Sequence, residues 1–334
     1  MNSQQVEHLS HGAGSGLGRE AVDTPLVSII IVNWNTRELL ADCLQSVYET
    51  VHDCLFEVFV VDNASTDGSA AMVRERFPDV CLIENADNVG FARANNQAIR
   101  ESVGKYVLLL NPDAVLFDDA ATALVLVLET LPHVGIVSPQ LLNPDGTLQE
   151  SWNHFPTLFR EIPFVNRLIR RGPGPAIDVG CLTVHEVDWV SGACFLIRRQ
   201  VLDSIGGLDE SFWLYTEETD FCYRARIHGH RVAFVADAHV RHARRAASSQ
   251  RMVVSMLWYY QSRVRFSAKH YSGLHAALHR DLLWLKALMW EMRPNSSPLR
   301  AAYADAPTDS IKKAYRQLRR VLTQPVGSLL ALRW

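Results

Sequence analysis

Residues 27–69 read VSIIIVNWNTRELLADCLQSVYETVHDCLFEVFVVDNASTDGS, and the order of patterns within them decides the fold. An apolar, β-branched run at Val27–Val32 is followed by helical spacing over Thr36–Tyr48 and by a second strand pattern at Glu57–Val61. Two strands joined by a crossover helix normally pair in parallel. The stretch therefore predicts the first unit of an α/β sheet.

The same alternation continues to residue 137. It predicts helices near Gly68–Phe77, Phe91–Ser102 and Asp118–Leu131, with strands at Val80–Ile83, Tyr106–Leu110 and Val134–Val137. Residues 138–180 are rich in turn signals, and we expect loops there. Beyond them we expect a strand at Val190–Ile197, a helix at Glu217–Ile227 and a strand at Arg231–Val235. Repeated alternation predicts a mainly parallel sheet with helices on both faces.

Length and composition divide the chain into three parts. The 334 residues are 48% hydrophobic and 21% charged, which is ordinary for globular proteins. We expect a flexible leader at 1–24, because it is polar and rich in Gly and Ser, an α/β domain at 25–250 and a helical extension at 251–334. The net charge of −3 gives no general attraction to nucleic acid, so no nucleic-acid partner is expected.

Location and redox state follow from what the sequence lacks. No apolar run approaches the roughly 20 residues of a bilayer span, and the start lacks the basic and apolar regions of a signal peptide. The six cysteines include no Cys-x-x-Cys pair. These features predict a cytoplasmic protein with reduced thiols.

A glycine-rich segment, Gly12–Gly18, resembles the cofactor turn of short-chain dehydrogenases. That turn needs a strand before the glycines and a helix after them. Here a polar leader precedes them, and Pro25 follows too soon for a packed helix. No Tyr-x-x-x-Lys occurs either, so the dehydrogenase interpretation, which NAD(P) binding would test, is disfavoured.

Polar residues end three of the predicted strands. They are Asn33-Trp34-Asn35, the run Asp62–Ser69 and Asn111-Pro112-Asp113. Taken alone, Asp62–Ser69 reads equally well as a helix cap, and Asn111–Asp113 as a turn. On consecutive crossovers they meet at the carboxyl edge of the sheet, where open α/β sheets bind ligands.

These segments resemble the family 2 inverting glycosyltransferases of GT-A fold, and in particular their rhamnosyltransferase-like branch. The resemblance covers about residues 25–250. The matching segments, in the family's order, are VSIIIVNWN (27–35), VVDNASTDGS (60–69), ENADNVGFARANNQAI (84–99), LLLNPDAVL (108–116), VSGACFLIRR (190–199), GGLDESFWLYTEETDFCYRAR (206–226) and the region of His242.

The resemblance implies a nucleotide-sugar donor and a divalent metal, Mg²⁺ or Mn²⁺. Asp62 would accept a hydrogen bond from the base, with Trp34 stacking on it. The other residues expected to bind the donor are Asn33, Asn35, Asn63, Asn88, Asn95 and Asn111. Asp113 and His242 would hold the metal. Asn111 stands where the family usually has an aspartate, which removes one negative charge from the site.

The general base is implied at Glu218, where the family usually has an aspartate. Glu217 or Asp220 could share or replace this role, because the longer side chain changes the geometry. Ser191 and Gly192 would form the loop beneath the donor sugar and acceptor. Trp213 and Tyr215 would stack on sugars, or simply pack beside the helix.

The branch favours dTDP-L-rhamnose as donor, with UDP-sugars next, and a saccharide or lipid-linked acceptor in cell-surface polysaccharide synthesis. The departures at Asn111 and Glu218 leave a non-catalytic nucleotide-sugar binding module as the alternative. In the extension, the first helix is expected to pack on the catalytic domain or on a second subunit. Tryptophans beside basic residues within 282–320 favour peripheral binding to the inner face of an anionic membrane, which truncation after about residue 280 should abolish.

Overall fold

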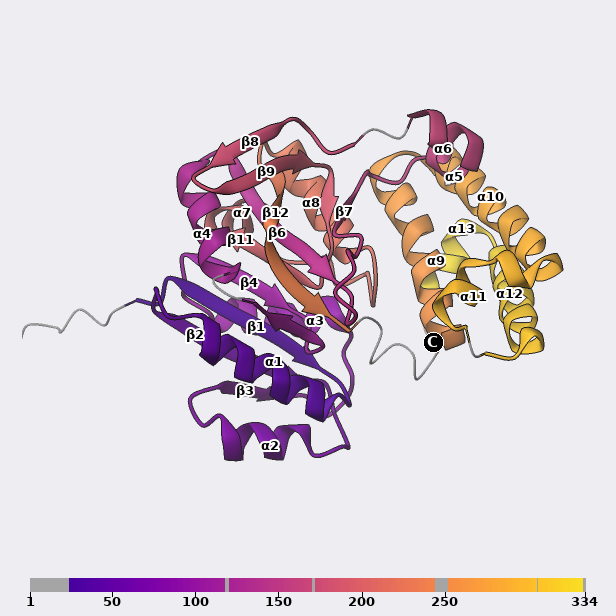
Figure 1. Ribbon diagram of the computed structural model, residues 1–334. Coiled ribbons are helices and arrows are strands. Elements are labelled where there is room, and N and C mark those ends of the chain that lie inside the picture. The colour runs from indigo at the N-terminus through magenta and orange to yellow at the C-terminus, as the bar shows by residue number, and fades with distance from the viewer. Residues whose placement is uncertain (1–23, 118–119, 170–171, 244–251, 305, 333–334) are drawn as a thin grey trace, which may run out of the picture.

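The computed structural model describes residues 24–117, 120–169, 172–243, 252–304 and 306–332. Within these ranges a large mixed sheet forms the centre of the molecule, with helices on both faces. A bundle of C-terminal helices stands beside it (Figure 1). The glycine-rich segment Gly12–Gly18 and residues 1–23 of the expected leader lie outside the described residues.

The first half of the sheet follows the predicted alternation. Its elements are β1 (Val27–Asn33), α1 (Arg37–Thr50), β2 (Phe56–Asp62), α2 (Ser69–Arg76), β3 (Cys81–Glu84), α3 (Phe91–Glu101) and β4 (Tyr106–Leu110). Strand β1 pairs in parallel with both β2 and β4, and Asn33 stands opposite Asp62 in register. The polar residues that end these strands therefore reach the same edge, as the sequence predicted.

The second half adds strands in both directions. Its elements are β5 (Ala114–Leu116), α4 (Ala120–Thr130), β6 (Val134–Leu142), β7 (Trp152–Asn153), α5 (Leu158–Glu161), α6 (Pro163–Ile169), β8 (Ala176–Val179), β9 (Leu182–Val187), β10 (Trp189–Val190), β11 (Cys194–Arg198), α7 (Arg199–Ile205), α8 (Glu217–Ile227) and β12 (Arg231–His242). The strand order is β3-β2-β1-β4-β11-β6-β12-β9-β8, with β5 paired to β12. Only β5, β9 and β11 run against the other strands of this sheet in the described chain.

Three sequence expectations for this half need correction, and the first is the strand Val190–Ile197, which residues 191–193 divide into β10 and β11. The stretch 138–180 is not only loop, because β6 extends to Leu142 and α5, α6 and β8 lie within it. The expected strand Arg231–Val235 continues to His242, past a shift in register between Val235 and His239. That irregularity breaks the period-2 pattern, and the extension carries His242 to the ligand-binding edge.

Apolar side chains pack on both faces of the sheet. Residues such as Leu40, Val73 and Leu124 place α1, α2 and α4 on one face. Ala92, Val201 and Phe221 place α3, α7 and α8 on the other. The central strands are covered on both faces, which accounts for the continuous apolar run in β1.

The C-terminal helices have a core of their own. They are α9 (Met252–His270), α10 (Gly273–Met292), a 3₁₀ turn at Pro294–Ser296, α11 (Pro298–Ala302), α12 (Thr308–Leu322) and α13 (Val326–Ala331). Leu257, Leu283 and Tyr315 are buried among them. Helix α9 contacts the sheet domain directly, since the Ser262 hydroxyl donates to the Leu214 carbonyl at 3.1 Å. No helix in the described ranges is long and apolar enough to cross a membrane.

Candidate active site

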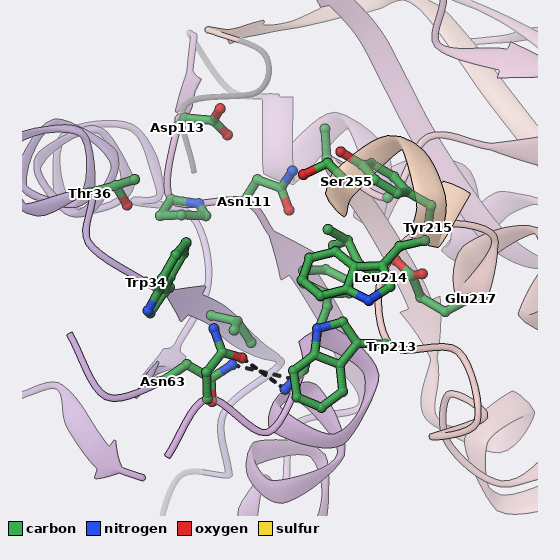
Figure 2. Close-up of a pocket in the computed structure, with 18 of the residues that line it drawn as sticks. Trp34, Thr36, Asn63, Asn111, Asp113, Trp213, Leu214, Tyr215, Glu217 and Ser255 are labelled. Atoms are coloured by element: carbon green, nitrogen blue, oxygen red, sulfur yellow. Dashed lines mark hydrogen bonds between the residues drawn. The ribbon is translucent and has the colours of Figure 1, made fainter. Parts of the chain in front are cut away.

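A cavity of about 680 Å³ opens at the carboxyl edge of the sheet, between the loops that follow β1, β2, β4 and β10 and the start of α8. In Figure 2, Trp34 faces it from one side and Trp213 from the other, and Asp113 and Asn63 lie toward opposite ends. Its size and its few polar groups among aromatic walls are typical of a small-molecule site.

Most of the residues proposed from the sequence line this cavity. They are Trp34, Asn63, Asn88, Asn111, Asp113, Ser191, Gly192, Trp213, Tyr215, Glu217, Glu218 and His242. They come from seven loops or element ends that are spread along the chain, so the fold gathers the motifs at one place.

Five proposed residues do not line the cavity. Asn33 and Asp62 lie behind it, where the Asn33 amide donates to an Asp62 carboxylate oxygen at 2.9 Å and the Ser65 N–H donates to the other oxygen at 2.9 Å. Asn35 accepts from the Thr66 N–H at 2.7 Å. These bonds tie the loops after β1 and β2 together, so the structure gives these residues a bracing position.

Asn95 and Asp220 are the other two. The Asn95 amide donates to the Phe91 carbonyl one turn earlier in α3, at 2.9 Å. Asp220 is fully buried and binds Arg224 of its own helix at 2.8 Å, and Lys269 and His270 of α9 at 2.7 Å each. Asp220 therefore joins α8 to α9 and faces away from the cavity.

Trp213 is held against the β3–α3 loop. The Phe91 N–H donates to the Trp213 carbonyl at 3.0 Å. Gly90 has φ +86°, and a Cβ there would meet the Trp213 ring at 3.0 Å. Only glycine adopts this backbone without strain and also admits the indole so closely.

Backbone strain gathers at the same place. The non-glycine residues with positive φ in the described chain are Asn35, Ala64, Tyr215 and Thr216. Ala64 and Tyr215 line the cavity, and the other two adjoin residues that do. Such conformations cost of order 1–3 kcal/mol each and cluster at functional sites. This is an indication of the site that does not depend on residue type.

One end of the cavity carries a carboxylate and an imidazole. The Asp113 oxygen Oδ1 lies 3.2 Å from His242 Nε2, and both side chains are mostly buried. The Asn111 amide nitrogen lies 3.5 Å from the same imidazole nitrogen. Strand pairing fixes this arrangement, because His242 at the end of β12 stands opposite Ala114 at the start of β5.

Asp113 and His242 fit a divalent cation that binds together with a diphosphate. Among the residues that the structure describes, no group of three or more His, Cys, Asp or Glu could hold a metal ion. A carboxylate oxygen and an imidazole nitrogen do converge here, however. Mg²⁺ is commonly held by one or two carboxylates, with substrate phosphates and water as further ligands.

Two adjacent glutamates begin α8 in the cavity wall. The Oε2 atom of each is buried and has no hydrogen-bond partner among the described residues. Burial raises the pKa of Glu218 to about 7. Burial, together with the neighbouring Glu218 charge, raises the pKa of Glu217 well above its ordinary value. Both carboxyl groups therefore favour the protonated form more than an exposed glutamate does, and the pKa of Glu218 lies near neutral pH.

The third acid of the cluster behaves differently. Burial opposes ionisation of Asp220, but hydrogen bonds from His270, Lys269 and Arg224 hold its pKa below the usual range. Asp220 is a permanently charged anchor, whereas Glu218 is poised to exchange a proton. The three acids that the sequence left as alternatives therefore have different surroundings, because Asp220 is ion-paired outside the cavity and the two glutamates are buried in its wall.

Sequence reasoning missed several residues of the site. Ser255 and Trp258 reach the cavity from α9, and the rings of Trp258 and Trp213 lie 6.0 Å apart. Gln149 contacts His242 from outside the cavity. The helical spacing around residue 256 indicated only a packed helix. An Asn-Pro-Asp-Gly turn just before Gln149 indicated only a loop.

Comparison with known proteins gives the family. The sequence model of Glycosyl transferase family 2 matches residues 28–206, which is more than half of the chain. The chain belongs to this family. It is a family 2 glycosyltransferase, similar to the rhamnosyltransferases, and this favours an enzyme over the non-catalytic alternative. The matched segment starts beyond the glycine-rich residues 12–18, which therefore play no part in the assignment.

The glycosyltransferase has relatives in bacteria and archaea. It is 27% identical over 252 residues to the N-acetylglucosaminyl-diphospho-decaprenol L-rhamnosyltransferase of Mycobacterium tuberculosis, covering 71% of this chain and 79% of that protein. It is 32% identical over 205 residues to the low-salt glycan biosynthesis hexosyltransferase Agl10 of Haloferax volcanii, covering 60% of this chain and 61% of that one.

A solved structure shares the fold. The mannosyltransferase PcManGT of Pyrobaculum calidifontis, in complex with GDP-Man and Mn²⁺, superposes with a TM-score of 0.51 at 21% identity, over 92% of this chain and 85% of that one. The sheet with its two helical layers is thus the GT-A fold, as the sequence predicted.

Proposed function

We propose that this glycosyltransferase inverts the anomeric configuration of the sugar it transfers, with Glu218 as the general base. The observation that carries the proposal is a buried carboxyl with a pKa of about 7 in the same cavity as the Asp113–His242 pair. A base is most effective when its pKa lies near the working pH.

The nucleotide occupies the end of the cavity between Trp34 and Asn63. The Trp34 indole offers a flat face for the base. Asp62 lies behind this wall and orients Asn33 and the loop that carries Asn63. The sugar and acceptor meet in the cavity beside the Ser191–Gly192 loop and Glu218, which form adjacent parts of its wall: a Cβ on Gly192 would meet the Glu218 side chain at 3.6 Å.

The reaction follows from this placement. Glu218 accepts the proton of the acceptor hydroxyl, and the hydroxyl oxygen forms a bond to the anomeric carbon as the bond from that carbon to the diphosphate breaks. Attack and departure occur on opposite faces, so a single displacement inverts the configuration. Burial and the neighbouring Glu218 charge raise the pKa of Glu217, which disfavours a second negative charge beside an ionised Glu218.

Asp113 and His242 would hold Mg²⁺ or Mn²⁺, which when bound neutralises charge on the diphosphate leaving group. Asn111, in place of a second carboxylate, directs its amide at His242 and leaves this end of the cavity less negative. A single carboxylate makes the metal depend on the diphosphate for its remaining ligands.

Similarity to rhamnosyltransferases supports dTDP-L-rhamnose as the donor, with UDP-sugars next. The name of the mycobacterial relative specifies a lipid-diphosphate-linked sugar as acceptor. We propose an acceptor of this lipid-linked class, used in cell-surface polysaccharide synthesis at the inner face of the membrane.

An exposed apolar surface supports membrane contact, but its residues are not those expected from the sequence. Trp284 and Trp290 pack into the helical core, where Trp290 contacts Tyr260 and Tyr315. Arg316 and Arg319 of the basic run pair with Glu291. The exposed apolar residues of this region instead lie on α10 and on the α5–α6 segment, whose helix α5 contacts α10, and together they are called the apolar face: Leu274, Leu278, Leu285, Met289, Met292, Phe159, Ile162, Phe164, Leu168 and Ile169.

A donor screen tests the proposed function. The full-length protein is incubated with dTDP-, UDP- and GDP-sugars, with Mn²⁺, with Mg²⁺ or with EDTA, and thermal stabilisation and release of the nucleoside diphosphate are measured. We expect stabilisation and turnover with dTDP-L-rhamnose only when metal is present. Equal turnover in EDTA would contradict the proposed metal requirement. Turnover with GDP-sugars alone would contradict dTDP-L-rhamnose as the donor.

A further inference from the structure

Gln149 holds His242 by both its ring and its backbone. His242 Nδ1 lies 2.7 Å from Gln149 Oε1, and the Gln149 amide nitrogen donates to the His242 carbonyl oxygen at 3.3 Å. Gln149 is mostly buried and does not line the cavity. Gln149 therefore contacts His242 on the side away from the cavity.

The orientation of the Gln149 amide is fixed by a second contact. Its nitrogen also donates to the Asn143 side-chain oxygen at 2.9 Å. With the nitrogen committed to two oxygen acceptors, Oε1 is the atom that faces the imidazole, and it can only accept. Nδ1 consequently carries a hydrogen, and Nε2 is the ring nitrogen on the cavity side, 3.2 Å from Asp113 Oδ1.

The surrounding turn holds Gln149 in place. The Asn143 N–H donates to the Thr147 carbonyl at 2.8 Å, and the Gln149 N–H donates to the Leu141 carbonyl at 2.8 Å. Gln140 braces the same segment by donating to the Gln149 carbonyl at 2.8 Å. Gln149 thus belongs to a rigid extension of β6, next to the β12 end that carries His242.

We propose that Gln149 is a positioning residue for the transferase reaction, because it fixes the Nδ1–H tautomer of His242 and aims Nε2 at the place shared by Asp113 and the donor diphosphate. Imidazoles that bind metals are typically oriented by an acceptor on the other ring nitrogen, and loss of that acceptor typically costs 10–100-fold in metal affinity. The inference rests on the proposed function.

Two substitutions separate positioning from a merely structural role. Gln149→Met preserves length but removes both the acceptor and the donor. Gln149→Glu keeps an acceptor for Nδ1–H, loses the donated bonds to Asn143 and to the His242 carbonyl, and places a carboxyl oxygen against those two acceptors. A structural role predicts equal defects in the two variants, whereas positioning predicts that Glu rescues. Gln140→Met is the matched control, because it loosens the same segment without touching the imidazole.

The tautomer is read directly by nitrogen NMR of protein labelled at its 13 histidines, with His242→Asn to assign the signal. Titration of Mn²⁺ with dTDP or UDP gives metal-dependent affinity in parallel. We expect Nδ1–H in the wild type, in Gln149→Glu and in Gln140→Met. In Gln149→Met we expect a mixed or reversed tautomer and about 10–100-fold weaker Mn²⁺–nucleotide binding.

An unchanged tautomer in Gln149→Met, or equal loss of affinity in the Met and Glu variants, would overturn the proposal. If the wild type bound neither dTDP nor UDP with Mn²⁺, the proposed function would fail. The NMR comparison would still decide whether Gln149 sets the tautomer.

Discussion

Burial of Glu218 gives its carboxyl group a pKa suited to proton transfer, and it lowers the stability of the folded protein when that group is ionised. Its pKa is raised to about 7 by burial, against an ordinary value of 4.5, so the folded protein binds a proton more tightly than the unfolded chain does. Stability therefore falls as pH rises from about 4.5 to about 7 and stays reduced above that range. This is the arrangement expected of a residue retained for its reactivity.

Glu218→Gln should accordingly stabilise the protein at pH 8, by up to about 3 kcal/mol, and the gain should shrink toward pH 4.5. Denaturant unfolding at several pH values measures it. The control is Glu38→Gln, which replaces an exposed glutamate in the first turn of α1. A destabilised Glu218→Gln variant at pH 8 would show that the carboxylate is held by favourable contacts and is not strained.

Asp113 is the carboxylate paired with His242. Asp113→Ala should therefore weaken the metal-dependent affinity for the donor by more than about 100-fold, while the fold is retained. Calorimetry with Mn²⁺ and the donor nucleotide measures the affinity, and circular dichroism checks the fold. Asp87→Ala is the matched control, since Asp87 is an exposed carboxylate lining the same cavity. Unchanged Mn²⁺-dependent affinity in Asp113→Ala would refute this role.

Residue types could be predicted from the sequence better than residue roles. The motifs containing Trp34 and Asp113 were identifiable because polar residues directly follow apolar strands, whereas Glu218 was identifiable only through the family resemblance. That Asp62 lies behind the cavity wall depends on hydrogen bonds between two loops, and no spacing in the chain encodes such contacts. The contact of Gln149 with His242 likewise joins residues 93 positions apart.

Helix α8 presents its acids to the cavity because its opposite side is anchored to α9. Asp220 in α8 binds Lys269 and His270 of α9 and Arg224 of its own helix. Asp220→Ala would remove a buried carboxylate shared by these three side chains, although Lys269 would keep Asp209, 2.7 Å away. We expect a loss of roughly 3–5 kcal/mol in the free energy of unfolding.

Guanidinium unfolding measures that loss. The control is Asp281→Ala, which removes an exposed carboxylate paired with Arg280 and should cost less than about 1 kcal/mol. Similar small losses in both variants would mean that the Asp220 cluster does not anchor α8.

Elements were predictable where local pattern and packing agree. β4 and α8 occur at the predicted residues, because β4 is an unbroken apolar run and α8 has acidic residues in its first turn and a glycine with positive φ, Gly229, just after its end. The sequence analysis missed β9, although Leu182, Val184 and Val187 are buried and the segment nearly alternates. The expected strand Val190–Ile197 is divided into β10 and β11 by the Ser191–Ala193 loop. Because apolar residues lie on both sides of this loop, the sequence looked like one continuous strand, although the loop lines the cavity.

The whole molecule combines a catalytic sheet with a helical bundle that completes the cavity and exposes an apolar face. Truncation after residue 280 would remove Leu283 and Tyr315 from the bundle core, so it would disrupt folding as well as any membrane contact. Point substitutions on the exposed face are therefore the appropriate test.

Leu285→Ser together with Met289→Ser should reduce sedimentation with anionic vesicles several-fold and leave the catalytic sheet intact. Leu126→Ser, an exposed apolar residue on α4, is the control. Equal sedimentation of the double variant and the wild type would exclude this face as the membrane contact. A loss of self-association in the double variant, without any change in vesicle binding, would assign the face to a second copy of the chain.

The central claim is that Glu218 is the base of an inverting transfer, and the pH dependence of donor turnover tests it most directly. With metal and dTDP-L-rhamnose, or whichever donor the screen identifies, the wild-type rate should rise with pH through about 7 and then level off, because Glu218 must be ionised to accept a proton. Glu218→Gln should bind the donor normally, turn it over about 10²–10⁴-fold more slowly and lose this pH dependence. Normal turnover by Glu218→Gln, with the same rise through pH 7, would contradict the account.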